Sequence, residues 1–250
     1  MRYLSVCSGI EAATCAWHPL GWEPVAFAEI EKFPSAVLAH HYPNVPNLGD
    51  MTKYKEWNLG PIDLLVGGTP CQSFSIAGLR KGLDDPRGNL MLTFGAIAAK
   101  YRPKWMVWEN VPGVLSSNGG LDFASFLGLI TGQEVTPPQD GWKNSGIVAG
   151  YKNAYGIAYR VLDAQYAGVP QRRRRVFVVG YLGDWRRAAA VLFERHSMSG
   201  NPAPSREARQ DVTGTLGSRS TAGGGLGTDF ELGGGLQPVA RAKGASPTKS

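Results

Sequence analysis

Short apolar runs alternate with helix-like segments along the first 130 residues, and this alternation limits the folds that the chain can adopt. The apolar runs are predicted to be strands, at residues 3–7, 25–28, 62–66 and 105–109. The segments with apolar residues at helical spacing are predicted to be helices, at residues 11–17, 33–40, 90–100 and 122–130. Consecutive strands linked by helices form parallel sheets with right-handed crossovers. We therefore expect an α/β fold with a Rossmann-like, doubly wound and mostly parallel sheet.

The character of the chain changes after this alternation. Residues 157–162 and 176–181 are apolar, β-branched and separated by a basic loop, so they predict a late antiparallel pair of strands. Residues 131–150 contain two adjacent prolines and predict an exposed insertion or loop. Residues 201–250 hold ten glycines and one aromatic residue, a composition that buries little apolar surface and predicts disorder. We therefore divide the chain into a folded part, 1–181, and a Gly-rich part, 182–250.

Composition narrows the classes of function. The net charge of +6 favours an anionic partner, and nucleic acid is the first candidate. Three cysteines without a CxxC pair predict neither a disulfide framework nor a zinc site. No apolar stretch reaches the ~18 residues that a membrane span needs. The N-terminus has no signal-peptide layout, so we expect the protein in the cytoplasm.

One loop carries the residues best suited to chemistry. It reads GGTPCQSFSIAG at residues 67–78, and its two glycines permit a bend or a close approach of the backbone. Pro70 fixes the backbone immediately before Cys71. Open α/β sheets place their chemistry on loops at the carboxyl ends of strands, so Cys71 is a candidate nucleophile. The alternative is that Cys71 is a small buried apolar residue, the commonest state of a free cysteine.

Two other strand ends carry groups that could hold a nucleotide-like cofactor. Ser8 and Gly9 follow the first strand and begin a helix, where backbone N–H groups suit an anion. Glu29 ends the second strand, where a carboxylate can accept both hydroxyls of a ribose. The alternative for Glu29 is a solvated glutamate at the start of a helix. The GxGxxG fingerprint of dinucleotide-binding proteins is absent, which disfavours NAD.

Glu109 and a run of arginines complete the set of candidate residues. Glu109 ends the buried run 105–109, and packing does not require a glutamate there, so we favour a functional role. Four consecutive arginines at 172–175 lead directly into the apolar run 176–181. Such a run is either a dense anion site or a solvated charged loop.

Three motifs together resemble those of DNA (cytosine-5)-methyltransferases of the Dcm-like and phage types. PCQ at 70–72, with GG upstream and SFS directly after it, is similar to the catalytic loop of that family. ENV at 109–111 is similar to its second signature, and QRRRR at 171–175 fits its third, QxRxR. The motifs occur in the family's order, and the resemblance covers residues 1 to about 180.

The resemblance implies a fold that binds S-adenosylmethionine and a role for each matched residue. It implies activation of the base by Cys71, Glu109, Arg173 and Arg175. It implies cofactor contacts from Ser8, Gly9, Ile10, Glu29, Ile30, Asp50, Met51, Gly68, Pro70 and Leu90. It implies DNA contacts, without any metal, from Gln72, Ser73, Gln171, Arg172 and Arg174. The first turn departs from the family pattern DxFxGxGG, because only Gly9 is retained and Cys7 stands where an aromatic residue faces the adenine.

The implied reaction is methyl transfer to C5 of cytosine in double-stranded DNA, through a covalent bond between Cys71 and C6 of an extruded base.

Two C-terminal motifs of the family, the last of which completes the cofactor pocket, are not recognisable in residues 182–250. The Gly-rich part resembles at most the start of a target-recognition region, so a longer chain or a second chain would supply the rest. Two alternatives stay open: a weak or silent DNA- or cofactor-binding fragment, and a nicotinamide oxidoreductase. The implied location is the cytoplasm of a bacterial or phage-infected cell.

Overall fold

The computed structural model describes residues 1–70, 90–168 and 170–193. Clustering of the chain gives two units, and each is considered by itself. The first contains Met1–Leu162 and Arg175–Arg195, and the second contains Asp163–Arg174 and His196–Ser250. Residues 201–250 lie outside the described residues, so their expected disorder stays a prediction.

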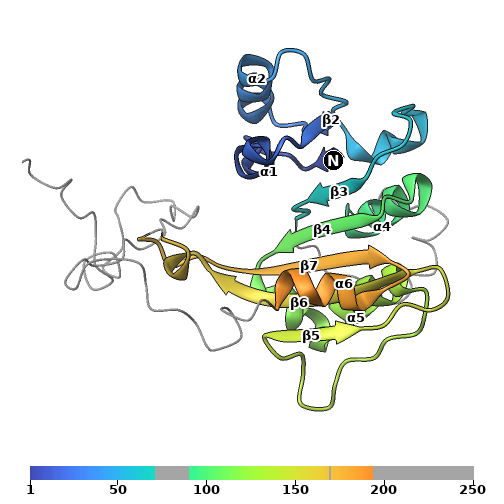
Figure 1. Ribbon diagram of the computed structural model, residues 1–250. Helices are drawn as coiled ribbons and strands as arrows, with labels where there is room; N and C mark the ends of the chain where they lie inside the picture. Colours follow the sequence, from blue (N-terminus) through green and yellow to red (C-terminus); the bar gives the residue numbers. More distant parts are fainter. Residues whose placement is uncertain (71–89, 169, 194–250) are drawn as a thin grey trace, which may run out of the picture. The chain divides into compact units, whose positions relative to one another are not determined.

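The described strands form one sheet of seven strands in the order β2-β1-β3-β4-β7-β6-β5 (Figure 1). Their bounds are β1 Arg2–Val6, β2 Glu23–Ala28, β3 Leu64–Gly67, β4 Trp105–Asn110, β5 Ser145–Val148, β6 Tyr155–Asp163 and β7 Arg174–Leu182. β1 is parallel to β2 and β3, and β3 is parallel to β4. β7 is antiparallel to β4, and β5 is antiparallel to β6. The α/β fold predicted from the sequence is therefore confirmed, with a parallel half at β1 to β4 and antiparallel strands beyond it.

Helices cover both faces of this sheet. The α-helices are α1 Ala12–Trp17, α2 Lys32–His41, α4 Leu90–Tyr101, α5 Leu121–Thr131 and α6 Trp185–Leu192. Short 3₁₀ turns are η1 His18–Leu20, η2 Met51–Glu56, η4 Pro112–Leu115, η5 Ser117–Gly120 and η6 Ala164–Tyr166. Side chains alternate between the two faces of a strand, so each strand of the parallel half contributes to two layers of packing.

The main core lies between the sheet and the pair α4 and α5. Leu4 and Leu65 point into it from neighbouring strands and are fully buried. Trp108 of β4 packs on Phe126 of α5 with ring centroids 4.3 Å apart, and Phe94 of α4 completes the aromatic layer. Because these side chains anchor β4 from one face, the end of β4 is held firmly where the candidate site begins.

The opposite face carries α1 and α6. Tyr3 of β1 reaches Thr14 of α1, with 2.5 Å between the two hydroxyl oxygens. Ala188 and Leu192 of α6 pack on Val179 of β7 and form a second, smaller apolar cluster. Figure 1 shows α6 lying across β6 and β7. Helix α6 was not among the predicted elements, and it shows that the folded chain continues past residue 181.

The prediction of an exposed insertion or loop at residues 131–150 is wrong for five of them, because Thr131 ends α5 and residues 145–148 form a strand. Residues 145–148 form β5 and pair with β6 from Ser145 opposite Arg160 to Val148 opposite Ile157. Trp142 anchors the segment, because its ring meets Phe123 edge-on at 5.1 Å and its Nε1 donates to the carbonyl of Gly120 at 2.9 Å. The strand is as short as β3, but its residues are exposed or half-buried, so it lacks the buried apolar run that marks β3.

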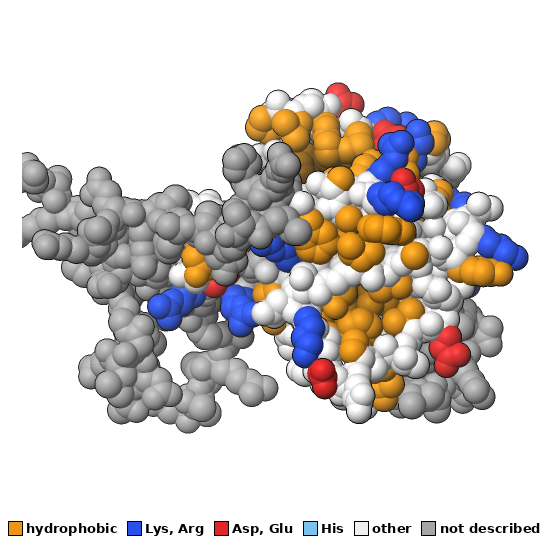
Figure 2. Space-filling model, turned by 60° about the horizontal axis from the view of Figure 1, so that its bottom comes forward, with side chains coloured by type: hydrophobic (Ala, Val, Ile, Leu, Met, Phe, Trp, Pro, Cys, Tyr) orange, Lys and Arg blue, Asp and Glu red, His pale blue; other side chains and the backbone are white. Residues whose placement is uncertain are grey.

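Basic side chains, which outnumber acidic ones in this chain, lie at several separate places on the surface (Figure 2). Figure 2 shows Lys and Arg side chains at separate positions on the face in view, with apolar surface between them. On that face they do not form one continuous patch, so the net charge alone does not locate a nucleic-acid contact. Within the three described ranges, no helix is long and apolar enough to cross a membrane.

Candidate active site

The carboxyl ends of the four parallel strands meet at one edge of the sheet. The register pairs Val6 with both Ala28 and Gly67, and pairs Gly67 with Trp108. The residues that follow these strand ends therefore lie side by side along the edge. This edge is where α/β folds place their ligands, because the loops there are free to vary while the strands hold them in register.

Two glycines allow β3 to end close to its neighbours. A Cβ on Gly67 would lie 2.6 Å from Cγ2 and 2.8 Å from the carbonyl oxygen of Val6, so a side chain does not fit there. A Cβ on Gly68 would lie 2.9 Å from Oε2 of Glu109. Glu109 therefore lies directly over the backbone that leads into the Pro-Cys loop. The sequence predicted a close approach at these glycines without identifying what approaches them.

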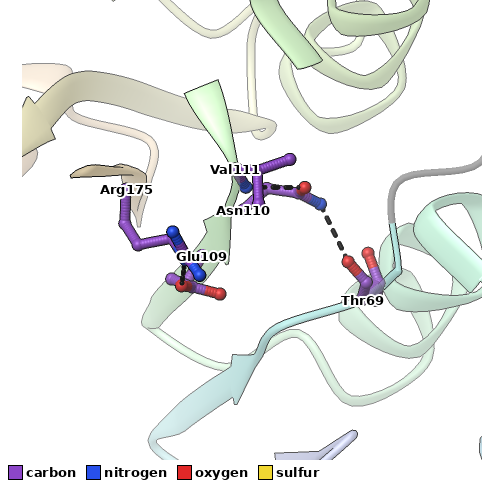
Figure 3. A network of polar contacts seen from close by, with 5 residues as sticks. All are labelled: Thr69, Glu109, Asn110, Val111 and Arg175. Atoms are coloured by element: carbon purple, nitrogen blue, oxygen red, sulfur yellow. Dashed lines mark hydrogen bonds and ion pairs between the residues drawn. The ribbon is translucent and has the colours of Figure 1, made fainter. Parts of the chain in front are cut away.

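Thr69 is held by two side chains of β4, and Figure 3 shows one of them, Asn110. Trp108 Nε1 donates to the Thr69 hydroxyl at 2.9 Å, and Asn110 Nδ2 donates to the Thr69 carbonyl at 2.8 Å. The Asn110 carbonyl oxygen accepts from the backbone N–H of Val111 at 2.8 Å. Thr69, Trp108 and Asn110 are all buried. The chain is thus fixed two residues before Cys71, although Cys71, Gln72 and Ser73 lie outside the described residues.

Glu109 forms an ion pair with Arg175 at the start of β7. The distance from Arg175 Nε to Glu109 Oε1 is 2.9 Å, and the two side chains are 23% and 32% exposed. β7 runs antiparallel to β4, with Asn110 opposite Val176, so the first residues of β7 return to the edge where β4 ends. Solvent screens a pair this exposed, so its main effect is to orient the carboxylate rather than to stabilise the fold.

The rest of the basic run belongs to the second unit. Arg172, Arg173 and Arg174 are exposed, and Gln171 is half-buried. The backbone of Arg173 is fixed by Asp163, whose Oδ1 accepts from the Arg173 N–H at 3.1 Å. Of the predicted arginines, the structure brings Arg175 to Glu109. The predicted roles of the others stay predictions.

Glu29 lies at the end of β2 with its carboxylate bound by three backbone N–H groups. Oε2 accepts from Gly9 at 2.8 Å, and Oε1 accepts from Ile30 at 2.9 Å and Glu31 at 2.8 Å. Three donors hold the carboxylate in one orientation and use three of its roughly four lone-pair sites, which leaves about one site for another donor. Glu29 is only 8% exposed, so it is not the solvated glutamate of the alternative interpretation.

The first turn is open in front of Gly9. A Cβ built on Gly9, which has φ +56°, would meet nothing within 4 Å. Ile10 and Ile30 border this region and are 59% and 67% exposed. An oriented carboxylate and two exposed apolar side chains therefore border an open turn at this edge of the sheet.

The hydroxyl group of Ser8 stabilises the turn, and its hydrogen is not available to a ligand. Its hydroxyl donates to the Ser5 carbonyl at 3.0 Å and accepts from the Ala28 N–H at 3.2 Å.

Glu11, at the place of a family glycine, is buried and caps α1. Its carboxylate accepts from the Ser5 hydroxyl at 2.7 Å and from the Thr14 N–H at 3.2 Å. Loss of hydration on burial raises the pKa of Glu11.

Cys7 occupies the place of the family's aromatic residue and is a poor nucleophile. Burial, together with the carboxylates of Glu29 and Asp50, raises the pKa of the Cys7 thiol to about 11. Its sulfur lies 3.4 Å from the sulfur of Met51. Cys7 therefore stays protonated and packs between the first turn and η2.

The other predicted cofactor residues lie around the same edge. Asp50 caps η2, and its Oδ1 accepts from the Thr52 N–H at 2.9 Å. Met51 is buried beneath it, Leu90 begins α4 and is half-buried, and Pro70 is exposed. Sequence reasoning missed Asn47, which binds the backbone of a distant residue and belongs to no recognisable motif. It also missed the role of Thr69, which lies in the predicted loop but is held by side chains of the distant strand β4.

Solved structures of methyltransferases share this fold. A DNA modification methyltransferase encoded within a prophage of E. coli matches with a TM-score of 0.52 at 22% identity, over 73% of this chain and 47% of that one. The S. pombe Dnmt2 methyltransferase matches with a TM-score of 0.51 at 17% identity, over 74% of this chain and 51% of that one. At these identities the likeness defines the fold alone.

The chain belongs to the C-5 cytosine-specific DNA methylase family, whose sequence profile matches residues 1–132 and 141–220. The match includes all three motifs and extends beyond residue 180, where the resemblance read from the motifs ended. It leaves out residues 133–140, inside the segment predicted as an insertion.

The similar proteins come from phages and bacteria. The DNA N-6-adenine-methyltransferase of Escherichia phage P1 is 44% identical over 89% of this chain and 34% of its own length. The orphan methyltransferase M.SPRI of Bacillus phage SPR is 32% identical over 74% of this chain and 38% of its own length. The type II methyltransferase M.AquIA of Picosynechococcus is 34% identical over 72% of this chain and 71% of its own length. The chain therefore spans about a third of the two phage relatives and most of M.AquIA.

Proposed function

We propose that the chain carries the catalytic part of a DNA (cytosine-5)-methyltransferase that uses S-adenosylmethionine. The observation that supports this most strongly is the Glu109–Arg175 ion pair of 2.9 Å, set directly over Gly68 at the start of the Pro-Cys loop. A carboxylate and a guanidinium side by side match the donors and acceptors on one edge of a cytosine. The anchored Thr69 fixes the point from which the loop with Cys71 begins.

The edge formed by β1, β2 and η2 has the features that the cofactor needs. Glu29 would accept the ribose hydroxyls, and the turn at Gly9 would take the amino-acid end. Ile30 and Asp50 would meet the adenine. Ser8, Ile10, Met51, Gly68, Pro70 and Leu90 would complete the surroundings. When bound, S-adenosylmethionine supplies an electrophilic methyl group.

The residues of the chain would activate a carbon that is otherwise a weak nucleophile. The thiolate of Cys71 forms a bond to C6 of the cytosine, which makes C5 nucleophilic. Glu109 accepts a hydrogen bond from the exocyclic amine and shares a proton with N3, and this proton offsets the negative charge that develops on the ring as the thiolate adds. Arg175, with Arg173, holds O2 of the base. After C5 has gained the methyl group it loses its proton to a base, the bond to C6 breaks, and Cys71 leaves as the thiolate.

DNA would be held mainly by its phosphates. Arg172 and Arg174 carry fixed charges on exposed side chains, and Gln171 precedes them in the chain. Gln72 and Ser73 would contact the DNA from the Pro-Cys loop. The base must leave the stack to reach Cys71, at a cost of a few kcal/mol. Contacts on one side of the duplex do not hold such a state well. We therefore propose that full activity needs the C-terminal part of the family, in a longer chain or in a second chain.

The partial coverage of the relatives supports this requirement. The chain spans 34% of the phage P1 relative and 38% of the phage SPR relative. The Gly-rich residues after α6 would be the start of a target-recognition region. Alone, the 250-residue chain would bind the cofactor weakly, show little sequence preference and turn over slowly. A weak or silent binding fragment is the limiting form of this proposal.

One observation favours a second candidate, transfer to N6 of adenine. The phage P1 relative, 44% identical, is named a DNA N-6-adenine-methyltransferase. The match covers 34% of that protein, so the named activity need not reside in the shared segment. The exocyclic amine of adenine carries its own lone pair and needs no thiolate addition to the ring. The two candidates therefore differ in their need for Cys71.

The test is single-turnover transfer of a tritiated methyl group to mixed-sequence DNA by wild type, Cys71→Ser and Cys15→Ser. Cys15 is an exposed cysteine of α1 and provides a matched control. We expect Cys71→Ser to abolish transfer while Cys15→Ser retains it. Transfer by Cys71→Ser at more than a few per cent of the wild-type rate would contradict the proposed chemistry and favour the second candidate.

A further inference from the structure

One exposed asparagine links the two segments that would form the cofactor site. Asn47 lies between α2 and η2, where its backbone makes an isolated parallel bridge to Phe27 of β2. Its Oδ1 accepts from the N–H of Glu29 at 3.0 Å and from the N–H of Gly49 at 3.1 Å. Its Nδ2 donates to the carbonyl of Glu29 at 3.0 Å and to the hydroxyl of Ser35 at 3.2 Å. Both donors and both acceptors of the amide are therefore used within the protein.

The pair of bonds to Glu29 replaces a strand partner where β2 ends. The bridge continues β2 through Phe27, whose N–H donates to Pro46 at 2.9 Å and whose carbonyl accepts from Leu48 at 2.8 Å. Beyond that point the side chain of Asn47, rather than its backbone, binds both the N–H and the carbonyl of Glu29. The backbone of Glu29 is thus fixed in one conformation. That conformation directs its carboxylate to the N–H of Gly9, 2.8 Å away.

The bond to Gly49 fixes the second segment. Gly49 has φ +70°, a conformation that places Asp50 at the start of η2. Asn47 thereby ties the backbone before Asp50 to the backbone of Glu29 through a single oxygen atom. Asn47 itself is exposed, so apolar burial does not account for its four hydrogen bonds.

We propose that Asn47 is a positioning residue for the cofactor, which sets Glu29 and the turn at Gly49 and Asp50 in the arrangement that binds ribose and base together. This inference rests on the proposed function, because Glu29 and Asp50 are the cofactor contacts assumed there. Asn47 does not touch the ligand and acts through Glu29.

The experiment measures the affinity of the full chain for S-adenosylhomocysteine by calorimetry, in wild type, Asn47→Ala, Glu29→Ala and the double variant. Asn44→Ala is the control, because Asn44 is an exposed asparagine three residues away on the same connection. Asn47→Ala should weaken binding on the order of tenfold, the effect expected when two or more neutral hydrogen bonds that orient a ligand group are lost. Asn44→Ala should leave the affinity unchanged.

The double variant separates positioning from a general structural role. If Asn47 acts mainly through Glu29, removing Asn47 from the Glu29→Ala chain should weaken binding clearly less than removing it from the wild type, and the remaining effect measures the share of the turn at Gly49 and Asp50. Asn47→Asp should also weaken binding, because it keeps the two acceptor bonds but loses the donor to Glu29 and adds a negative charge beside it. Thermal unfolding of each variant, followed in parallel, should show shifts that do not track the loss of affinity.

The outcomes distinguish this inference from the function on which it rests. If Glu29→Ala weakens binding but Asn47→Ala leaves it unchanged, only the proposed role of Asn47 is overturned. An equal loss on removing Asn47 in both backgrounds would overturn action through Glu29. Failure of the wild type to bind, or binding that Glu29→Ala leaves intact, would overturn the proposed cofactor site and the inference together.

Discussion

Replacing Asn110 by alanine tests whether the clamp on Thr69 serves catalysis. The change removes the donor to the Thr69 carbonyl, 2.8 Å away, and the acceptor for the Val111 N–H, also 2.8 Å away. Thr69 is 3% exposed and Asn110 is 4% exposed, so water cannot easily replace the first bond. A buried carbonyl left without a partner costs about 1–3 kcal/mol.

That free energy can appear in stability, in the rate, or in both. If the fold holds and the cost falls on the transition state, about 1–3 kcal/mol lowers the methyl-transfer rate by about 5-fold to about 150-fold. The cofactor contacts of Glu29 and Gly9 are untouched, so cofactor affinity should stay within twofold of wild type. Trp108→Phe removes the second bond to Thr69, from Nε1 to the hydroxyl at 2.9 Å, but it also shrinks a buried ring packed on Phe126, so it should lower stability as well as the rate.

The assay is single-turnover methyl transfer at saturating cofactor, with urea unfolding of the same preparations. Asn58→Ala is the control, because Asn58 is exposed and lies outside the site. A variant that unfolds more easily by the expected amount but transfers methyl groups at the wild-type rate would refute the argument. Thr69 would then be a structural anchor without influence on the Pro-Cys loop.

Three other predictions follow from the same edge of the sheet and its surroundings. Gly68→Ala places a Cβ 2.9 Å from Oε2 of Glu109. It should lower the methyl-transfer rate by about 10-fold or more and change the cofactor affinity little. Equal rates in the variant and the wild type would show that Glu109 moves aside without effect. Burial raises the pKa of Glu11 in the folded state. The free energy of unfolding of the wild type should therefore fall relative to that of Glu11→Gln as the pH rises above about 4.3, the value in the unfolded chain, and through the raised pKa. A difference between the two proteins that does not depend on pH would contradict the burial argument. Replacing Arg172 and Arg174 by glutamine should flatten the slope of log DNA affinity against log salt by about 1.8, and an unchanged slope would make the run a solvated loop.

Much of the fold could be predicted because its elements carry strong local signals. The strands of the parallel half have short apolar runs between glycines and helix-like segments, and each appears within one or two residues of its predicted bounds. β5 was missed because four half-exposed residues give no periodic signal and the strand depends on pairing with β6. α6 was missed because two arginines and three alanines in eight residues hide an apolar face that consists of little more than Ala188 and Leu192.

The site could be predicted only as far as its motifs reach. Glu109 was predicted from a carboxylate at the end of a buried strand, and Arg175 from the QxRxR pattern. Asn47 carries no such signal, because its side chain binds the backbone of a residue 18 positions away. The role of Thr69 gives no signal either, because its backbone carbonyl is bound by a side chain 41 positions away. Contacts between a side chain and a distant backbone depend on how the strands come together, which a single sequence does not show.

The central claim is that the chain directs methyl groups to C5 of cytosine through Cys71. The most direct measurement is to incubate the 250-residue chain with mixed-sequence DNA and labelled S-adenosylmethionine, digest the DNA to nucleosides and separate them by mass. We predict label in 5-methyldeoxycytidine and none in N6-methyldeoxyadenosine, with no label in either nucleoside when Cys71 is serine. Label in N6-methyldeoxyadenosine, or label in 5-methyldeoxycytidine that survives Cys71→Ser, would contradict the account.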